Sequence, residues 1–308
     1  MIVDNRFSRC LGESTVIGMT TYRASTADTE ILELDGVELA IERRGPTGAP
    51  ALLLLAGGAQ SMDWWTPEFC DLLGAGQLQV IRYDHRDTGQ SSASPPGRPD
   101  YTGDDLADDP LRILDALGID EAHLVGMSMG GGIAQNIAVR NRERVRSLTL
   151  VETSPAGGDH GELPPPSRAV AATWEEPEPE IDWTDENRVI DYRVDVERPF
   201  AGPLGLDEPR VRALATLEVR RSRDMASSMM NHFVAGSGTA VDPAEIRVPT
   251  LVLHSADDPM FPLPHGEALA RVIPGARLVR LAGVGHEIPP PAVWDVVLPQ
   301  LHRHVLGA

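Results

Sequence analysis

The chain has 308 residues, 42% hydrophobic and 24% charged, which is the composition of a globular protein with a sizeable core. Its net charge of −19 disfavours nucleic acid and anionic membranes as partners, because both repel an acidic surface. Two cysteines, Cys10 and Cys70, are too few for a disulfide framework. We therefore expect a reducing compartment, the cytoplasm.

We expect no targeting signal in the N-terminal segment. Residues 1–18 lack the continuous apolar stretch of a signal peptide, and nothing in the chain approaches the roughly 20 apolar residues that span a membrane. We expect residues 1–29 to be an extension outside the fold, either disordered or, over 1–18, upstream sequence from an early start codon.

From residue 30 onward, strand patterns alternate with helix patterns. Asp35-Gly36 separates two alternating runs, 31–34 and 37–42, and predicts a hairpin. Further strands are predicted at 51–55, 79–83, 123–125, 148–151, 248–254 and 276–281. Helices are predicted at 66–73, 103–118, 133–139 and 291–305. This alternation is typical of a mainly parallel sheet flanked by helices, an α/β fold.

The pattern is interrupted between the strands at 148–151 and 248–254. Residues 155–245 contain three consecutive prolines, an acidic run at 175–180 and helix-like stretches around 207–234, but no strong buried strand. We predict a mainly helical cap, 155–245, inserted between two parts of one core, 30–154 and 246–308. The acidic run is interpreted as a solvated loop.

One short motif indicates covalent chemistry. Gly126-Met127-Ser128-Met129-Gly130 fits the pattern G-x-S-x-G at the point where a predicted strand becomes a helix. A serine hydroxyl is a weak nucleophile, so it needs a base beside it and a third group to orient that base. Without such partners, Ser128 would simply be a small residue at a tight turn.

Partners for Ser128 follow two later strands. His286 lies in Gly283-Val284-Gly285-His286, and the pair Asp257-Asp258 follows the strand at 248–254. Alone, His286 would suit a surface loop and Asp258 a turn before proline. Together they give the order Ser, Asp, His at the carboxyl ends of strands, which is the edge where open α/β sheets bind ligands.

Four segments together resemble the α/β-hydrolase-fold serine hydrolases from about residue 30 to the end of the chain. They are LLAGG at 54–58, RYDHRDTGQSS at 82–92, GMSMG at 126–130, and HSADDPMFP at 254–262 with Gly285-His286. Within that family, the YDHRDTG segment and the Gly-Gly loop most resemble aclacinomycin methylesterases, which hydrolyse a methyl ester on an aromatic polyketide. This resemblance is carried by the core segments rather than by the cap.

The resemblance implies a two-step acyl transfer without cofactor or metal. Ser128 would be the nucleophile, His286 the base and Asp258 the acid, with Asp257 as the alternative acid. The backbone N–H groups of Gly58 and Met129 would form the oxyanion hole. Ala56 stands where the family usually has histidine, but because the donor is a backbone group the hole need not be lost.

Several aromatic and methionine side chains are candidates for the substrate pocket, and each has a plainer interpretation as core packing. Candidates are Trp64 and Trp65 after the Gly-Gly loop, and Met225, Met229 and Phe233 in the cap. The charged cluster at 84–87 is interpreted as a turn with internal ion pairs rather than a metal or phosphate site. The other histidines, including His254 and His265, are interpreted as packing or surface groups.

The function predicted is hydrolysis of a small-molecule carboxylic ester, apolar or aromatic, with methylesterase activity on a polycyclic polyketide as the specific hypothesis. Perhydrolase, haloperoxidase-like and lactonase activities use the same triad, and amide or carbon–carbon hydrolysis also stays open. A ligand-binding member of the fold without turnover is an alternative from another class, and ligand-induced stabilisation without turnover would distinguish it. An interaction protein would not need all three triad residues. The oligomeric state is left open.

Overall fold

The computed structural model describes residues 29–175 and 180–307. The expected N-terminal extension, with Cys10, and the middle of the acidic run at 175–180 lie outside the described residues.

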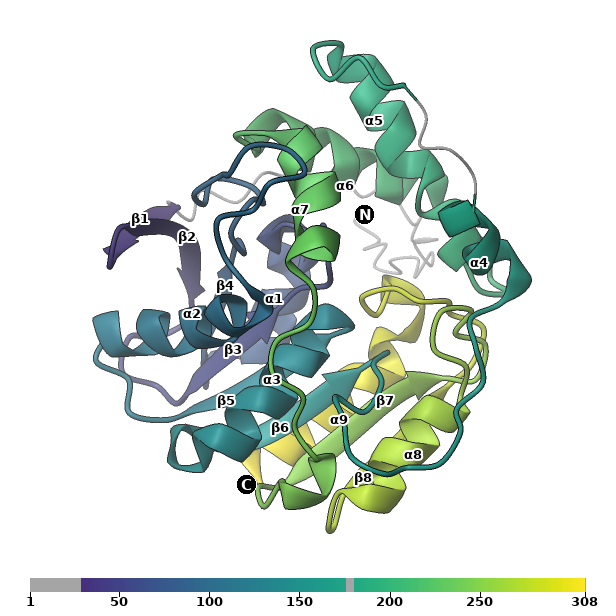
Figure 1. The fold of residues 1–308 in the computed structure, drawn as a ribbon. Coiled ribbons are helices and arrows are strands. Elements are labelled where there is room, and N and C mark those ends of the chain that lie inside the picture. The colour runs from purple at the N-terminus through teal and green to yellow at the C-terminus, as the bar shows by residue number, and fades with distance from the viewer. Residues whose placement is uncertain (1–28, 176–179, 308) are drawn as a thin grey trace, which may run out of the picture.

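A single sheet of eight strands organises the described residues, in the order β1-β2-β4-β3-β5-β6-β7-β8 (Figure 1). β1 and β2 form the antiparallel hairpin, β2 also pairs antiparallel with β4, and every later pair is parallel. The strands are β1 Glu30–Leu34, β2 Val37–Arg44, β3 Ala51–Leu55, β4 Gln79–Tyr83, β5 Ala122–Met127, β6 Val145–Val151, β7 Thr250–Ser255 and β8 Arg277–Leu281. The predicted α/β fold with a mainly parallel sheet is confirmed.

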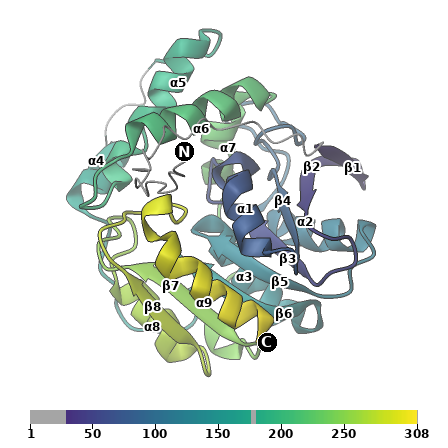
Figure 2. The ribbon, with the colours of Figure 1, turned by 180° about the vertical axis from the view of Figure 1, so that it is seen from behind.

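Helices cover both faces of this sheet. α2 and α3 lie with α8 in front of it in Figure 1, and α1 and α9 lie against the opposite face, seen in Figure 2. Their bounds are α1 Pro67–Gly74, α2 Gly103–Ala116, α3 Met129–Arg140, α8 Pro264–Val272 and α9 Trp294–Leu306. The predicted final helix begins with a 3₁₀ turn, Pro291–Val293, because the prolines at 289–291 cannot donate the hydrogen bonds of a regular helix.

The core consists of two apolar layers, one on each side of the sheet. Alternation along β3 divides its residues between them: Leu52 and Leu54 pack toward α1 and α9, whereas Leu53 and Leu55 pack toward α2 and α3. All four side chains are fully buried, as expected for a central strand covered on both faces.

Four α-helices in the described part of the chain between β6 and β7 form the cap over the carboxyl ends of the strands (Figure 1): α4 Arg168–Glu175, α5 Glu186–Asp195, α6 Glu208–Arg221 and α7 Met225–Ala235. Buried ion pairs and hydrogen bonds attach it to the core. Arg221 on α6 contacts Asp84 at 2.6 Å and Asp63 at 2.7 Å. Glu218, also on α6, accepts hydrogen bonds from the Ser61 N–H and from the indole N–H of Trp64.

The charged side chains of segment 84–87 form ion pairs with other elements of the fold and not with one another. Asp84 pairs with Arg221 of the cap, and Arg86 pairs with Asp109 on α2 at 2.7 Å. Asp87 accepts hydrogen bonds from Tyr101 and Asn231. The prediction of internal ion pairs was therefore wrong: the turn is structural, but its ion-pair partners are 23 or more residues away and were not visible in the local pattern.

Candidate active site

Ser128 lies between β5 and α3 in a strained backbone conformation. Its φ of 51° and ψ of −115° are unusual for a residue with a side chain, and such strain is found where a side chain must project from a sharp strand-to-helix turn. The turn is tight enough to require glycine on either side. A Cβ at Gly126 would lie 2.2 Å from the carbonyl oxygen of Gly130, and one at Gly130 would lie 2.5 Å from that of Leu55.

The structure brings Ser128, His286 and Asp258 into one hydrogen-bonded chain. The Ser128 hydroxyl lies 3.0 Å from Nε2 of His286, and Nδ1 of His286 lies 3.0 Å from Oδ2 of Asp258. The loop after β8 supplies His286 and the loop after β7 supplies Asp258. A Nδ1–H that donates to the carboxylate leaves Nε2 as the acceptor for the serine proton, the arrangement needed for a general base.

Of the two adjacent aspartates, only Asp258 faces the imidazole. Its second oxygen, Oδ1, accepts the backbone N–H groups of Met260 and Phe261 at 2.8 and 2.9 Å. Asp257 is exposed and accepts the Gly283 N–H instead, at 2.8 Å. The geometry therefore gives Asp257 no contact with the histidine.

Asp258 is held as a carboxylate. Its burial alone would raise the pKa. The charge of His286 and its hydrogen bond outweigh burial, together with the neighbouring Glu152 side chain and the Phe261 N–H, and the pKa lies below its ordinary value. An ionised Asp258 can stabilise a positively charged His286.

The expected oxyanion loop follows β3 and is fixed by the cap. The Gly57 N–H donates to the side chain of Gln60, and the Ala59 N–H donates to Nδ1 of His232 on α7 at 3.0 Å. Among residues 29–175 and 180–307, no group accepts the N–H of Gly58, which lies between these two. The N–H of Met129, at the first position of α3, similarly points out of the start of a helix.

A cavity of about 280 Å³ opens beside Ser128. It is lined by Ser128 and Met129, by α2 and α3, by residues 153–156 and 236–239, and by Phe261. Leu106, Ile133 and Phe261 give it apolar walls, and Asn136, Thr153 and Thr239 add neutral polar groups. None of its lining residues carries a charged side chain.

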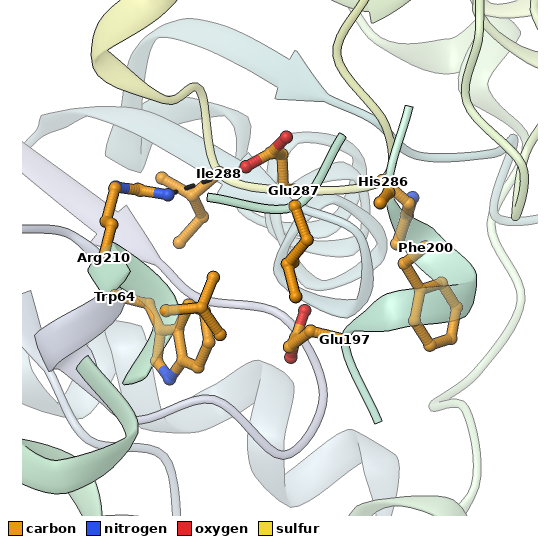
Figure 3. A pocket seen from close by; sticks show the side chains of 10 residues that line it. Trp64, Glu197, Phe200, Arg210, His286, Glu287 and Ile288 are labelled. Carbon is orange, nitrogen blue, oxygen red and sulfur yellow. Dashed lines mark ion pairs between the residues drawn. The ribbon is translucent and has the colours of Figure 1, made fainter. Parts of the chain in front are cut away.

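A second, much smaller cavity of about 10 Å³ lies on the other side of His286, beneath the cap (Figure 3). Trp64, Phe200 and Ile288 contribute its apolar surface, and Glu197, Arg210 and Glu287 its charged groups. Arg210 and Glu287 form an ion pair at 3.6 Å, drawn as the dashed line. Its volume corresponds to a single water molecule.

The five residues expected to line a substrate pocket are distributed differently. Trp64 is buried and lines only the small cavity, and Trp65 is buried against Phe69, with ring centroids 5.5 Å apart. Met225 is buried and Met229 half-buried, and neither lines either cavity. Helical spacing indicated a packed face here but not what it packs against.

Phe233 is the pocket candidate that comes near the oxyanion loop. Its ring atoms lie 3.6 and 3.7 Å from the position that a Cβ of Gly58 would occupy, and its side chain is 71% exposed. An exposed aromatic ring at that point is available to a substrate bound over Gly58, although it does not line the 280 Å³ cavity.

One buried trio has the residue types of a metal site. The ligand atoms of Glu152, His254 and Asp258 lie within 4.8 Å of one another. Nε2 of His254 donates to the carbonyl of Phe261 at 2.7 Å, and Asp258 is committed to His286. Because Nε2 of His254 carries a hydrogen and Asp258 is turned to His286, these two atoms offer no free ligand position, and we assign no metal to the trio.

Sequence reasoning missed the buried polar residues that support the site. Glu152 lies next to Asp258, His232 holds the expected oxyanion loop at Ala59, and Glu218 joins the cap to Trp64. His254 and His265 were interpreted as packing or surface groups; both are buried, and both make hydrogen bonds. The only local signal was a charged or polar residue within an otherwise apolar stretch, as at Glu152 directly after β6.

Comparison with known proteins agrees with this architecture. A family model for the α/β hydrolase fold matches residues 50–205, just over half of the chain. The chain belongs to the α/β-hydrolase family. This confirms the resemblance inferred from the sequence.

Two α/β-hydrolase relatives match over most of their length. Rhodomycin D methylesterase DauP of Streptomyces sp. strain C5 is 34% identical over 283 residues, covering 85% of this chain and 93% of the relative. Rhodomycin D methylesterase DnrP of Streptomyces peucetius is 33% identical with the same coverage. The solved enol-lactonase of Burkholderia xenovorans LB400 has a TM-score of 0.70 and 24% identity, covers 90% of this chain and 100% of that one, and shares the fold.

Among the residues that the structure describes, no helix is both long and apolar enough to cross a membrane.

Proposed function

We propose that this α/β hydrolase is a carboxylic-ester hydrolase that works through Ser128, His286 and Asp258. The observation that carries the proposal is the continuous hydrogen-bond chain from the Ser128 hydroxyl to the Asp258 carboxylate, beside a cavity large enough for an organic substrate. The oxygen of a serine placed in this way can attack a carbonyl carbon while the imidazole takes its proton.

The reaction would proceed in two balanced steps. In the first, Ser128 Oγ bonds to the ester carbon, His286 takes the hydroxyl proton and gives it to the departing alkoxide, and an acyl-enzyme and an alcohol result. In the second, water attacks the acyl-enzyme, His286 takes a proton from it and returns one to Ser128, and a carboxylic acid is released. The N–H groups of Gly58 and Met129 would stabilise the oxyanion in both, each worth roughly 3–4 kcal/mol.

The lining of the large cavity favours a neutral substrate with a sizeable, partly apolar body. A free carboxylate or phosphate would find no cationic side chain among the lining residues. The rhodomycin D methylesterases that match this chain support a methyl ester on a polycyclic aromatic acid as the specific substrate class. Cap residues 155–245 are proposed to shape the entrance, with Phe233 over Gly58.

Hydrolysis of p-nitrophenyl esters of graded acyl length, by wild type and Ser128→Ala, tests the proposal. We expect turnover in the wild type and a loss of at least about 10³-fold in the variant. Equal rates in the two proteins would contradict the assignment of Ser128.

If neither protein cleaves these esters, a polycyclic aromatic methyl ester is assayed next. Thermal stabilisation by that ester without release of methanol would support the ligand-binding alternative over the hydrolase.

A further inference from the structure

A second buried carboxyl group lies behind the triad. Glu152 is the first residue after β6, fully buried, with a φ of 42° that is rare for a residue with a side chain. Both of its carboxyl oxygens lie 2.9 Å from the N–H of Ser255, at the end of β7. A strained backbone here directs an acid toward the interior, where acidic side chains are seldom found without a cation.

Within residues 29–175 and 180–307, the groups around Glu152 offer no positive charge to balance it. Nε2 of His254 on β7 lies 3.9 Å from Glu152 and 3.8 Å from Asp258, but its hydrogen points to the Phe261 carbonyl. Burial lowers the pKa of His254, which therefore stays neutral. Asp258 and Glu287, from the loops after β7 and β8, add negative charge to the surroundings of Glu152.

Carboxyl oxygens of Glu152 and Asp258 lie within 4.8 Å of each other in this buried site. Two carboxyl groups this close cannot both be ionised without a large cost in free energy. Asp258 is the one that receives the compensating contacts: the His286 ring and the N–H groups of Met260 and Phe261. Glu152 has the Ser255 N–H alone among the described residues. The proton therefore belongs on Glu152.

We propose that Glu152 is a positioning residue, a permanently protonated carboxylic acid whose O–H donates a hydrogen bond to the Asp258 carboxylate and keeps that carboxylate turned toward His286. The effect of Glu152 on catalysis rests on the proposed function, whereas the protonation of Glu152 does not. In support, burial and the charge of Asp258 raise the pKa of Glu152 well above its ordinary value, and the bond to Glu152 contributes to lowering the pKa of Asp258. Donation from a neutral acid would also make Asp258, and through it His286, less basic.

Protonation is tested without any substrate by comparing the unfolding of wild type and Glu152→Gln between pH 5 and 8. Glutamine is nearly isosteric, can accept from Ser255 and can donate to Asp258. A group whose folded pKa is raised contributes stability below its unfolded pKa of about 4.3, and this stability is lost as pH rises toward the folded pKa. The equilibrium constant for unfolding of the wild type, divided by that of the variant, should therefore rise about tenfold per pH unit.

A ratio that does not change with pH would overturn the proposal, because Glu152 would then be ionised in the folded protein as it is in the unfolded chain. If Glu152→Gln does not fold, infrared spectroscopy of the wild type gives the same answer. A protonated-carboxyl band that persists at pH 7 and is missing from a stable Glu152→Met variant supports the proposal. No such band at pH 7 overturns it.

The positioning role is tested by the pH profile of ester hydrolysis in Glu152→Gln and Glu152→Met. Glutamine keeps the donor, so the acid limb of kcat/KM should stay within about 0.3 pH units of wild type. Methionine removes the donor, so Asp258 and His286 become more basic and the limb should move up by about one unit. A methionine variant with an unshifted limb would contradict the role. If Glu152 were ionised, Glu152→Gln would remove a negative charge from the site, and the acid limb of kcat/KM would move to lower pH instead.

Discussion

The strand-end site and the cap hold their polar residues in different ways. Ser128 directly follows β5, and Asp258 and His286 lie in the loops just after β7 and β8. Each is fixed by its own turn: a strained φ, a pair of N–H groups, or a glycine-rich loop. The cap is attached by contacts between residues more than 130 positions apart, such as Arg221 with Asp84 and His232 with Ala59. Local backbone geometry therefore positions the chemistry, and long-range polar contacts position the cover above it.

Of the substitutions considered, Asp258→Asn at the strand-end site is expected to have the largest effect, a loss of kcat. An amide in place of the carboxylate favours the wrong imidazole tautomer, which costs about 10⁴-fold in kcat in serine hydrolases of this design. Asp257→Asn is the matched control, since among the described residues the Asp257 carboxylate accepts only the Gly283 N–H, and we expect less than about a threefold change. Ester hydrolysis rates measure both, and similar losses in the two variants would contradict the assignment of Asp258.

Breaking the attachment of the cap should affect stability more than chemistry. Arg221→Met leaves Asp84 and Asp63 buried without their cation, which typically costs about 3–5 kcal/mol. Its neighbour Arg220 forms an exposed pair with Glu186 at 2.8 Å, so Arg220→Met should cost no more than about 1 kcal/mol. Denaturant unfolding compares the two, and equal losses would show that the buried pairs do not attach the cap.

Two glycines of α3 test how tightly the nucleophile turn is packed. A Cβ at Gly130 would lie 2.5 and 2.6 Å from two backbone oxygens, so Gly130→Ala should destabilise by about 1–3 kcal/mol and displace the oxyanion loop. Nothing lies within 4 Å of a Cβ at Gly132, and Gly132→Ala should be neutral or stabilise by up to about 1 kcal/mol. Thermal unfolding distinguishes them, and a tolerated Gly130→Ala would contradict the close approach.

The same contrast explains what could be predicted from the sequence. Strands could be predicted because apolar runs and the Asp35-Gly36 turn are local signals, and the three residues of the proposed triad could be picked out because each lies in a short pattern near a strand end. The residues that line the pocket could not be predicted. Helical spacing on α7 indicates that Met225 and Met229 share a packed face, but it does not show what that face packs against. Glu152 and Arg221 were missed because their roles depend on partners that only the folded sheet brings near.

Covalent labelling shows directly whether Ser128 is an activated nucleophile. The protein is treated with an organofluorophosphonate, which phosphonylates activated serines, and is then analysed by intact mass and peptide mapping. We expect a single adduct, located on Ser128, and none after His286→Ala. An adduct on another residue, or an enzyme that hydrolyses esters while Ser128 stays unmodified, would contradict the triad assigned to this site.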